Sequence, residues 1–291
     1  MQPSAISHRC ELIKKGVSKL FSINGAQKLV SRPSIAINFL RAFLFDVKLR
    51  KQSISDRLKM YEASISALAE LSIKQNPQTK LISTIEEAIG DVSEDSNCKD
   101  LAALLKNHGS DKSTVHNYHL VYAALLGQKR QAPLNIFEIG LGTNNIDTQS
   151  NMGANGRPGA SLRAFRDWAP NANIFGADVD ARILFSENRI RTFFVDQTKP
   201  ETLRNVAKNF QPKSFDLVID DGLHNSEANL NSLLFALELV RDDGAIVIED
   251  VSKIDLPFWQ TAFSVLGTEY TGKFIKTKYD YIVLIRKSLP N

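Results

Sequence analysis

Residues 215–224 read FDLVIDDGLH, a short apolar run that leads into two acids, a glycine and a histidine. Residues 245–251, AIVIEDV, repeat this shape, because a second apolar run also closes on two acids. A strand that is buried on both faces reads as a continuous apolar run, which is typical of a parallel sheet. Ligands of open α/β sheets bind outside the carboxyl ends of the strands, so these acids are predicted at the edge where a site belongs.

The chain after residue 130 continues this alternation of short apolar runs and helical stretches. Further strands are predicted at 134–140, 172–178 and 190–196, and helices at 161–168, 202–210 and 226–240. The alternation indicates βαβ units and therefore an α/β fold with a mostly parallel sheet. After a helix near 257–266, the segments 269–276 and 279–287 are closely connected. They are predicted to form an antiparallel pair at one edge of a seven-stranded sheet.

The first 97 residues are predicted to form a helical, basic N-terminal region, followed by a separate domain at 98–291. Residues 1–60 hold 12 Lys or Arg and 3 Asp or Glu, and residues 54–74 have the apolar spacing of a helix. Such an arm could make peripheral contact with an anionic membrane surface. The alternative interpretation is a solvated helical face that binds nothing.

The composition of the 291-residue chain, 43% hydrophobic and 23% charged, is typical of a globular protein. No apolar run reaches the ~18 residues that a membrane span needs. Cys10 and Cys98 are far apart and lack metal-site spacing, which favours a reducing compartment. The predicted location is cytoplasmic, with membrane association on the cytoplasmic face as an open hypothesis.

The first predicted strand ends in EIGLG (138–142), where Gly140 and Gly142 would allow a tight turn and a close approach to a ligand. The spacing is not the GxGxxG pattern of dinucleotide-binding folds. A plain strand-to-helix turn is therefore an alternative interpretation of these two glycines.

Acids also end the second and third predicted strands. Asp178 lies in GADVD (176–180), and an acid at this place can accept hydrogen bonds from ribose hydroxyls. Asp196 and Gln197, in VDQT (195–198), are candidates for contact with a nucleobase. Helix capping or a turn is the alternative role for each of these side chains.

Taken together, EIGLG, GADVD, VDQT, VIDDGLH and VIED resemble a class I S-adenosylmethionine-dependent methyltransferase. More narrowly, the chain is similar to the Mg-dependent O-methyltransferases of macrolide sugars, including a GSDK segment within HGSDKSTVHNYHLVYAALL (108–126). The resemblance covers about 105–286. It implies a Rossmann-like methyltransferase fold, with a mostly parallel seven-stranded sheet and an antiparallel edge strand, preceded by the helical N-terminal region.

The resemblance also implies roles for particular residues. The residues predicted to bind S-adenosylmethionine are Glu138, Gly140, Gly142, Ser161, Asp178, Asp196, Gln197 and Asp220. Asp111 and Lys112 could border the methionine end of this cofactor or the acceptor. The helix that follows holds His116, His119, Tyr118 and Tyr122, which are interpreted as surface or interface residues.

Asp221, Glu249 and Asp250 follow strands that lie side by side in this fold, so the three carboxylates are predicted to converge. Oxygen ligands with open positions suit Mg²⁺ or another hard divalent cation, and the resemblance implies the same three residues. The alternative is one capping acid and two solvated acids. Histidine is the side chain best suited to accept a proton near neutral pH, so His224 is predicted as the general base, acting with Asp221.

The leading hypothesis is an enzyme, a metal-assisted O-methyltransferase that uses S-adenosylmethionine and Mg²⁺ to methylate a hydroxyl of a sugar or glycan-type acceptor. The acceptor could be lipid-linked, no nucleic-acid partner is expected, and a homo-oligomer is left open. Asp178 and Asp180 form a DVD motif, so a metal-dependent glycosyltransferase is one alternative. A non-catalytic binding protein that keeps a methyltransferase fold is the other.

Overall fold

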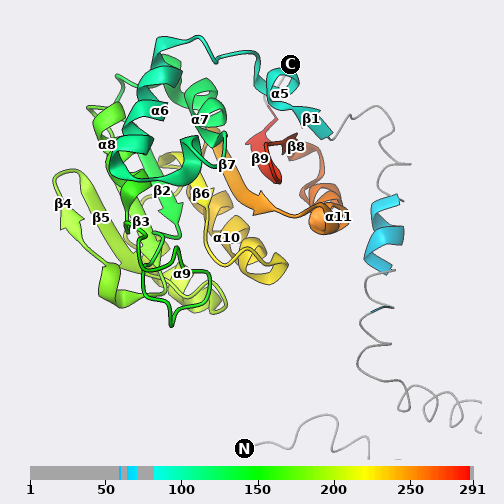
Figure 1. The fold of residues 1–291 in the computed structure, drawn as a ribbon. Helices are drawn as coiled ribbons and strands as arrows, with labels where there is room; N and C mark the ends of the chain where they lie inside the picture. Colours follow the sequence, from blue (N-terminus) through cyan, green and yellow to red (C-terminus); the bar gives the residue numbers. More distant parts are fainter. Residues whose placement is uncertain (1–58, 60–63, 71–81, 289–291) are drawn as a thin grey trace, which may run out of the picture. The chain divides into compact units, whose positions relative to one another are not determined.

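The computed structural model describes Lys59, residues 64–70 and residues 82–288 (Figure 1). Residues 64–70 are helical, within the helix predicted at 54–74. The basic arm predicted at 1–60 lies almost wholly outside the described residues, and so does most of the predicted region 1–97. The division of the chain at 97/98 stays a prediction. In the described part of the chain, no helix has the length and apolar character that crossing a membrane requires.

A single mixed sheet organises residues 82–288. Its strands are β1 (Ile82–Thr84), β2 (Asn135–Ile139), β3 (Asn173–Asp178), β4 (Ser186–Glu187), β5 (Ile190–Phe194), β6 (Phe215–Asp220), β7 (Val240–Val251), β8 (Tyr270–Lys276) and β9 (Tyr281–Lys287). They lie in the order β1-β8-β9-β7-β6-β2-β3-β5-β4. The five strands predicted to be parallel, β2, β3, β5, β6 and β7, pair in parallel. The Rossmann-like α/β prediction is confirmed.

The seven predicted strands are all present, but the sheet has nine strands. The two additional strands are too short to show a sequence pattern: β4 has two residues and pairs with β5, and β1 has three residues and pairs with β8. The predicted place of the antiparallel pair was wrong. Strand β9 is antiparallel to both β7 and β8, and β1 covers the outer side of β8, so the pair does not form the sheet edge.

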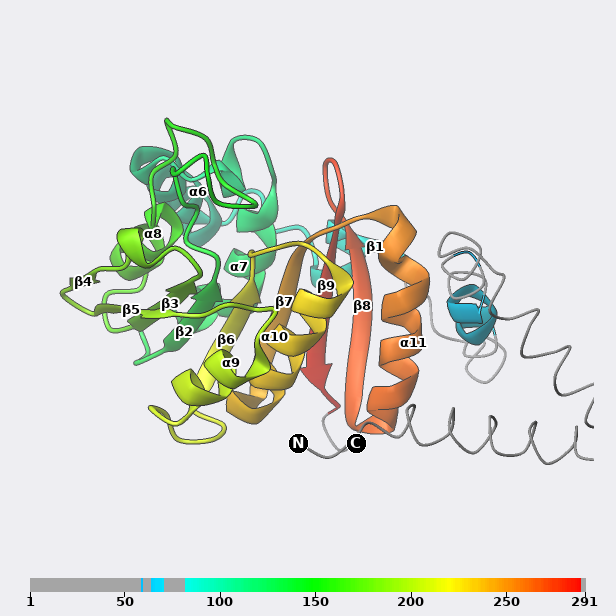
Figure 2. The ribbon, with the colours of Figure 1, turned by 90° about the horizontal axis from the view of Figure 1, so that it is seen from below.

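Helices cover both faces of the sheet (Figures 1 and 2). They are α5 (Ile85–Ile89), α6 (Ser96–His108), α7 (Tyr118–Leu126), α8 (Ala160–Trp168), α9 (Pro200–Ala207), α10 (Ser226–Leu239) and α11 (Leu256–Leu266). Alternate strand residues point to opposite faces: Ile136 packs in the cluster with α6, α7 and α8, and Phe137 packs in the cluster with α9, α10 and α11. Apolar side chains on both faces explain why the strands read as unbroken apolar runs.

The direction of the strands decides where a site can form. All five parallel strands have their carboxyl ends at one edge of the sheet. Strand β8 runs in the same direction as β7, because both are antiparallel to β9. The turn between β8 and β9, residues 277–280, therefore also lies at this edge. The helix cap at Asn225, whose side chain accepts from Ala228 N at 2.9 Å, starts α10 just after the edge.

Candidate active site

A cavity of about 480 Å³ opens at the carboxyl ends of β2, β3, β5, β6 and β7, a size that suits a small-molecule ligand. Its walls include Gly140, Gly142, Asp178, Asp196, Gln197, Asp221, His224, Glu249 and Asp250. Nine of the twelve residues predicted for the site therefore line one cavity. Residues 148–152 of the long loop after β2 also line it, so this loop covers part of the site.

The turn after β2 needs glycine for a steric reason. Gly140 has a φ of 95°, and a Cβ built there would lie 1.9 Å from the backbone oxygen of Asp221. Gly222 has a similar restriction, because its Cβ would lie 2.0 Å from Gln197 Oε1. The absence of side chains at these two positions lets the segments after β2, β5 and β6 approach one another and form the wall of the cavity.

Asp178 is held in place by the backbone around the cavity. Its Oδ2 accepts from Leu141 N at 2.7 Å, and its Oδ1 accepts from Asp180 N at 2.8 Å. Burial raises the pKa of Asp178, although these N–H donors oppose the effect. Each carboxylate oxygen has two lone pairs, so Asp178 can still accept hydrogen bonds from a ligand.

Gln197 connects the cavity wall to the buried interior. Its Nε2 donates to Asp220 Oδ1 at 2.7 Å, and its Oε1 accepts from Leu223 N at 2.8 Å. Asn229 of α10 donates to the other oxygen of Asp220 at 2.9 Å. These contacts show that the Asp220 side chain lies on the α10 side of the sheet, behind the wall.

Three residues predicted to bind the cofactor do not line the cavity: Glu138, Ser161 and Asp220. Glu138 is fully buried, and its Oε2 accepts from Ser161 Oγ at 2.7 Å. Burial raises the pKa of Glu138, while Lys112 lowers it. These side chains support the wall from behind, and their predicted contact with the cofactor stays a prediction.

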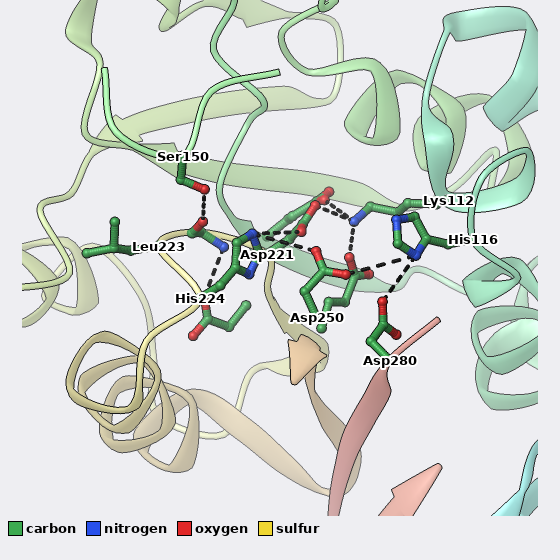
Figure 3. Close-up of polar contacts among 12 residues, drawn as sticks. Lys112, His116, Ser150, Asp221, Leu223, His224, Asp250 and Asp280 are labelled. Atoms are coloured by element: carbon green, nitrogen blue, oxygen red, sulfur yellow. Dashed lines mark hydrogen bonds and ion pairs between the residues drawn. The ribbon is translucent and has the colours of Figure 1, made fainter. Parts of the chain in front are cut away.

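Asp221, His224 and Asp250 form a group at the mouth of the cavity (Figure 3). His224 Nε2 lies 3.6 Å from Asp250 Oδ2 and 3.9 Å from Asp221 Oδ1. Each of the three side chains is between 26% and 30% exposed, so a ligand in the cavity can reach them. His224 and Asp250 have φ angles of 53° and 54°, which L-residues rarely adopt and which often occur at functional sites.

Lys112 lies next to this group and changes the interpretation of Glu249 (Figure 3). Its Nζ lies 2.5 Å from Asp221 Oδ2 and 3.2 Å from Glu138 Oε1, and it donates a short hydrogen bond to Glu249 Oε2. Burial of Lys112 opposes its charge, but the carboxylates of Asp221, Glu249 and Glu138 outweigh this and raise its pKa. An internal ammonium group therefore lies between two of the three predicted metal ligands.

Glu249 is consequently engaged on both oxygens. Tyr122 donates a hydrogen bond to its Oε1, and Lys112 occupies its Oε2. Tyr118, one turn earlier on α7, donates to Asp250 Oδ1. Burial works to raise the pKa of Asp250, but the Tyr118 hydrogen bond and the nearby His224 and Lys112 hold it below its ordinary value.

The interpretation of Tyr118 and Tyr122 as surface or interface residues was wrong, because both are at most 1% exposed. Their spacing of four residues places them on one face of a helix, and Glu249 and Asp250 are adjacent in the chain. This i, i+4 spacing could have indicated that the two tyrosines share one helix face. Nothing in the local sequence indicates which strand end that helix face contacts. The prediction that Lys112 borders the cofactor or the acceptor rested only on the family resemblance.

The geometry is suitable for a hard divalent cation. The side chains of Asp221, His224 and Asp250 offer ligand atoms that all lie within 4.8 Å of one another. Two carboxylates beside a cavity, with room for water and substrate, are a usual setting for Mg²⁺. Glu249 is not in this group, and it can serve as the third predicted ligand only if Lys112 moves from its Oε2.

The DVD motif has another role. Asp180 accepts hydrogen bonds from Thr143 at 2.6 Å and Asn145 at 2.7 Å, and it pairs with Arg182 at 2.6 Å. The Asp180 carboxylate thus holds the long loop after β2. Among the described residues, neither Asp178 nor Asp180 belongs to a group that could hold a metal, which disfavours the glycosyltransferase alternative.

Known proteins similar to this chain are O-methyltransferases. No family model matches the chain. Over 163 residues it is 29% identical to the 8-demethyl-8-alpha-L-rhamnosyl tetracenomycin-C 2'-O-methyltransferase of Streptomyces olivaceus. The matched segment covers 56% of this chain and 40% of that enzyme. Over 93 residues it is 38% identical to the mycinamicin VI 2''-O-methyltransferase of Micromonospora griseorubida. This shorter match covers 32% of this chain and 23% of that enzyme. The chain thus matches less than half the length of these relatives.

A solved structure supports the same comparison. The chain is similar to the MycE methyltransferase from the mycinamycin biosynthetic pathway in complex with Mg, SAH and mycinamycin VI. The TM-score is 0.52 at 23% identity, over 66% of this chain and 57% of that chain. The chain therefore has the Rossmann-like methyltransferase fold, and its resemblance to the macrolide-sugar O-methyltransferases is confirmed.

Proposed function

We propose that this protein is a metal-assisted O-methyltransferase that transfers a methyl group from S-adenosylmethionine to a hydroxyl of a sugar or glycan-type acceptor. The observation that carries the proposal is the convergence of Asp221, His224 and Asp250 at the mouth of the cavity. The relatives that match this chain are named as sugar O-methyltransferases, which supports the same reaction.

The methyl donor would bind in the deep part of the cavity. Asp178 would accept the ribose hydroxyls, in the manner of the acid at the end of the second strand of dinucleotide-binding folds. Asp196 and Gln197 would contact the adenine, and the backbone at Gly140 and Gly142 would approach the methionine part. All five residues line the same cavity, which supports one continuous donor site.

Asp221 and Asp250 would hold the divalent cation, because both residues line the cavity and an oxygen of each lies within 4 Å of His224 Nε2. Glu249 as the third ligand remains a prediction from the sequence. When bound, the cation would lower the pKa of the acceptor hydroxyl and orient it.

His224 would then act as the general base. Its Nε2 takes the proton of the acceptor hydroxyl, and the oxygen attacks the methyl carbon of the sulfonium in line. The new O–C bond forms as the S–C bond breaks, and the electron pair of that bond leaves on sulfur as S-adenosylhomocysteine. The products are the methyl ether and a protonated imidazole, which returns its proton to water.

The narrower predictions about partners belong to this proposal as well. A lipid-linked acceptor would agree with contact between the basic arm at 1–60 and an anionic membrane surface on the cytoplasmic side. Self-association of the chain is a separate expectation, which sedimentation of the purified protein tests directly.

The proposal is tested by a transfer assay with S-adenosylmethionine labelled on its methyl group and a panel of sugar acceptors. Product should form with Mg²⁺, disappear with EDTA and return when Mg²⁺ is added in excess. Calorimetry with S-adenosylhomocysteine distinguishes the alternatives. A protein that binds this ligand but transfers no methyl group to any acceptor would support the non-catalytic alternative instead.

A further inference from the structure

A second cavity lies beside Asp250, and this residue lines both cavities. The second cavity has a volume of about 430 Å³. Its walls come from the short helix η4 (Lys253–Asp255), from the end of β8 and from the turn at 277–280. Because β8 runs parallel to β7, this turn reaches the same edge of the sheet as the site described above.

Three exposed lysines line the second cavity: Lys253, Lys276 and Lys278. They come from different segments, and among residues 82–288 no carboxylate forms an ion pair with any of them. The two acids in the cavity wall, Asp250 and Asp280, are both engaged. Asp250 accepts from a tyrosine hydroxyl and Asp280 from a threonine hydroxyl, and each lies within 4.0 Å of the imidazole of the same histidine. The cavity therefore presents positive charge that residues 82–288 do not neutralise by ion pairs.

An exposed aromatic ring stands beside these lysines. Tyr279 is 67% exposed, and the Nζ of Lys278 lies 4.9 Å from the centre of its ring. The ring also meets His116 edge-on, with centroids 6.2 Å apart. His116 is also 3.4 Å from Asp280, which connects the ring to the acids of the wall (Figure 3). A tyrosine in this position offers a rigid contact surface for a ligand at a low cost in conformational entropy.

We propose that the second cavity binds an anionic group of the acceptor, a phosphate or a carboxylate, while the hydroxyl to be methylated lies beside Asp221 and His224. Ammonium groups bind phosphate and carboxylate through charge-assisted hydrogen bonds, which are about twice as strong as neutral ones. A neutral sugar would leave the three lysines without a partner. Asp250 forms the border between the two cavities, so one acceptor can occupy both. This inference rests on the proposed function and narrows its substrate class to anionic sugars.

The test measures binding of simple probes to the full-length protein loaded with S-adenosylhomocysteine and Mg²⁺. The probes are inorganic phosphate, glucose 1-phosphate, glucuronic acid and the neutral methyl glucoside, each titrated by calorimetry or NMR. Comparison of glucose 1-phosphate with glucuronic acid distinguishes phosphate from carboxylate as the recognised group. The titrations are repeated without Mg²⁺. Anion binding that persists without Mg²⁺ cannot be due to the metal, and the lysines are still present to account for it.

The variant for this test replaces the three lysines together, as K253Q, K276Q and K278Q. Its matched control is K106Q, K208Q and K273Q, which removes the same charge from exposed lysines that also lack ion pairs among the described residues and lie outside the second cavity. Saturable millimolar binding of at least one anionic probe is expected for the wild type. It should fall at least about tenfold in the first variant and stay unchanged in the control.

The inference is overturned if the methyl glucoside binds as well as the anionic probes, if no anionic probe binds the wild type, or if both variants bind alike. Binding of S-adenosylhomocysteine is measured in each sample and does not depend on these lysines. If that ligand does not bind, the proposed function fails, whatever the probes do. If it binds while the probes fail, the methyltransferase proposal stands and only the anionic acceptor is lost.

Discussion

His224 is the residue on which the proposed proton transfer depends. It has a φ of 53°, and its Nε2 lies within 4 Å of the carboxylates of both Asp221 and Asp250. We expect His224→Ala to lower the turnover number by ~10²–10⁴, because the acceptor hydroxyl loses its base. Single-turnover kinetics with saturating donor and acceptor measure this loss.

The same position could instead supply a ligand to the metal, and a metal titration separates the two roles. His224→Ala should leave Mg²⁺ affinity unchanged if the imidazole is the base. Weaker Mg²⁺ binding, in proportion to the loss of turnover, would assign His224 to the metal site instead.

Asp221 is a predicted metal ligand that lines the cavity and is 26% exposed. We expect Asp221→Asn to weaken Mg²⁺ binding about tenfold or more, because the neutral amide removes a charged ligand from a hard cation. Isothermal titration in the presence of S-adenosylhomocysteine measures the change. Donor affinity itself should stay close to the wild-type value, and a fall in donor affinity alone would contradict the metal role.

Glu249→Gln in the same titration tests the third ligand predicted from the sequence. A loss of Mg²⁺ affinity as large as that of Asp221→Asn would show that Glu249 can leave Lys112 for the metal. Unchanged affinity would remove Glu249 from the ligand set and leave it as the buried partner of Lys112 and Tyr122.

Lys112 is a buried charged residue whose loss should destabilise the fold. Its ammonium group is 2% exposed and pairs with Glu138, Asp221 and Glu249. We expect Lys112→Met to lower the free energy of unfolding by about 3–5 kcal/mol, because it leaves buried carboxylates without a cation. Urea denaturation measures the change.

The control for this substitution is Lys273→Met, since Lys273 is exposed and lies outside the cavity at Asp221. This control should change the unfolding free energy by no more than ~0.5 kcal/mol. Equal stability of the two variants would mean that the ion pairs of Lys112 contribute no net stability.

At the scale of elements, the site depends on how closely the turns after β2 and β6 approach one another. Gly140 N donates to Ala177 O and Asp221 N donates to Ile139 O, both at 2.8 Å, so the three strand ends are joined by backbone hydrogen bonds. A Cβ at Gly140 cannot be accommodated without separating these turns, because it would meet backbone atoms rather than a flexible side chain.

We therefore expect Gly140→Ala to weaken binding of S-adenosylhomocysteine and to lower stability by more than the ~1–3 kcal/mol of backbone strain alone. Gly90→Ala is the matched control, since Gly90 has a φ of 82° but no atom within 4 Å of its Cβ position. Calorimetry and thermal unfolding give both quantities. If the two variants behave alike, the loss of affinity and stability is due to the positive φ angle alone and not to the contact with Asp221.

Helix α7 contributes to the site through one face. Tyr118 and Tyr122 donate to the adjacent acids at the end of β7, and Lys112 comes from the short helix η1 (Asp111–Ser113) just before α7. The segment that precedes the first parallel strand thus covers the carboxylates from the side opposite α10. This arrangement keeps Glu249 dry and leaves Asp221 and Asp250 partly accessible from the cavity.

At the scale of the whole molecule, donor binding should stabilise the fold, because the donor site joins the ends of several strands. S-adenosylhomocysteine at 100 times its dissociation constant should add about 2.7 kcal/mol to the free energy of unfolding. For a domain of this size that corresponds to a rise in Tm of roughly 5–10 °C. Differential scanning fluorimetry measures the shift.

Asp178→Ala provides the comparison, because it removes the proposed ribose contact. At the same ligand concentration, the shift in Tm should be small or absent for this variant. A full shift in Asp178→Ala would mean that the ligand binds elsewhere or that the ribose does not meet this carboxylate.

Local patterns were sufficient for much of the fold. The apolar runs predicted five parallel strands and two antiparallel ones, because burial on both faces of a sheet imposes a continuous apolar sequence. The short strands β1 and β4 could not be predicted, because two or three residues are too few to show a periodic pattern of apolar side chains. The antiparallel pair of β8 and β9 does not form the sheet edge, because Ile82–Thr84 pair with Phe274–Lys276, about 190 residues away along the chain.

The sequence by itself determined the seven longer strands, the edge at which their acids gather and the chemistry predicted for those acids, since each depends on residues within one short segment. Only the tertiary structure decided which acids share a binding partner. Lys112 lies 109 residues from Asp221 along the chain, yet its ammonium group lies between Asp221 and Glu249 in the site. No local pattern records such a contact, because a buried charge finds its partner through the packing of the whole domain.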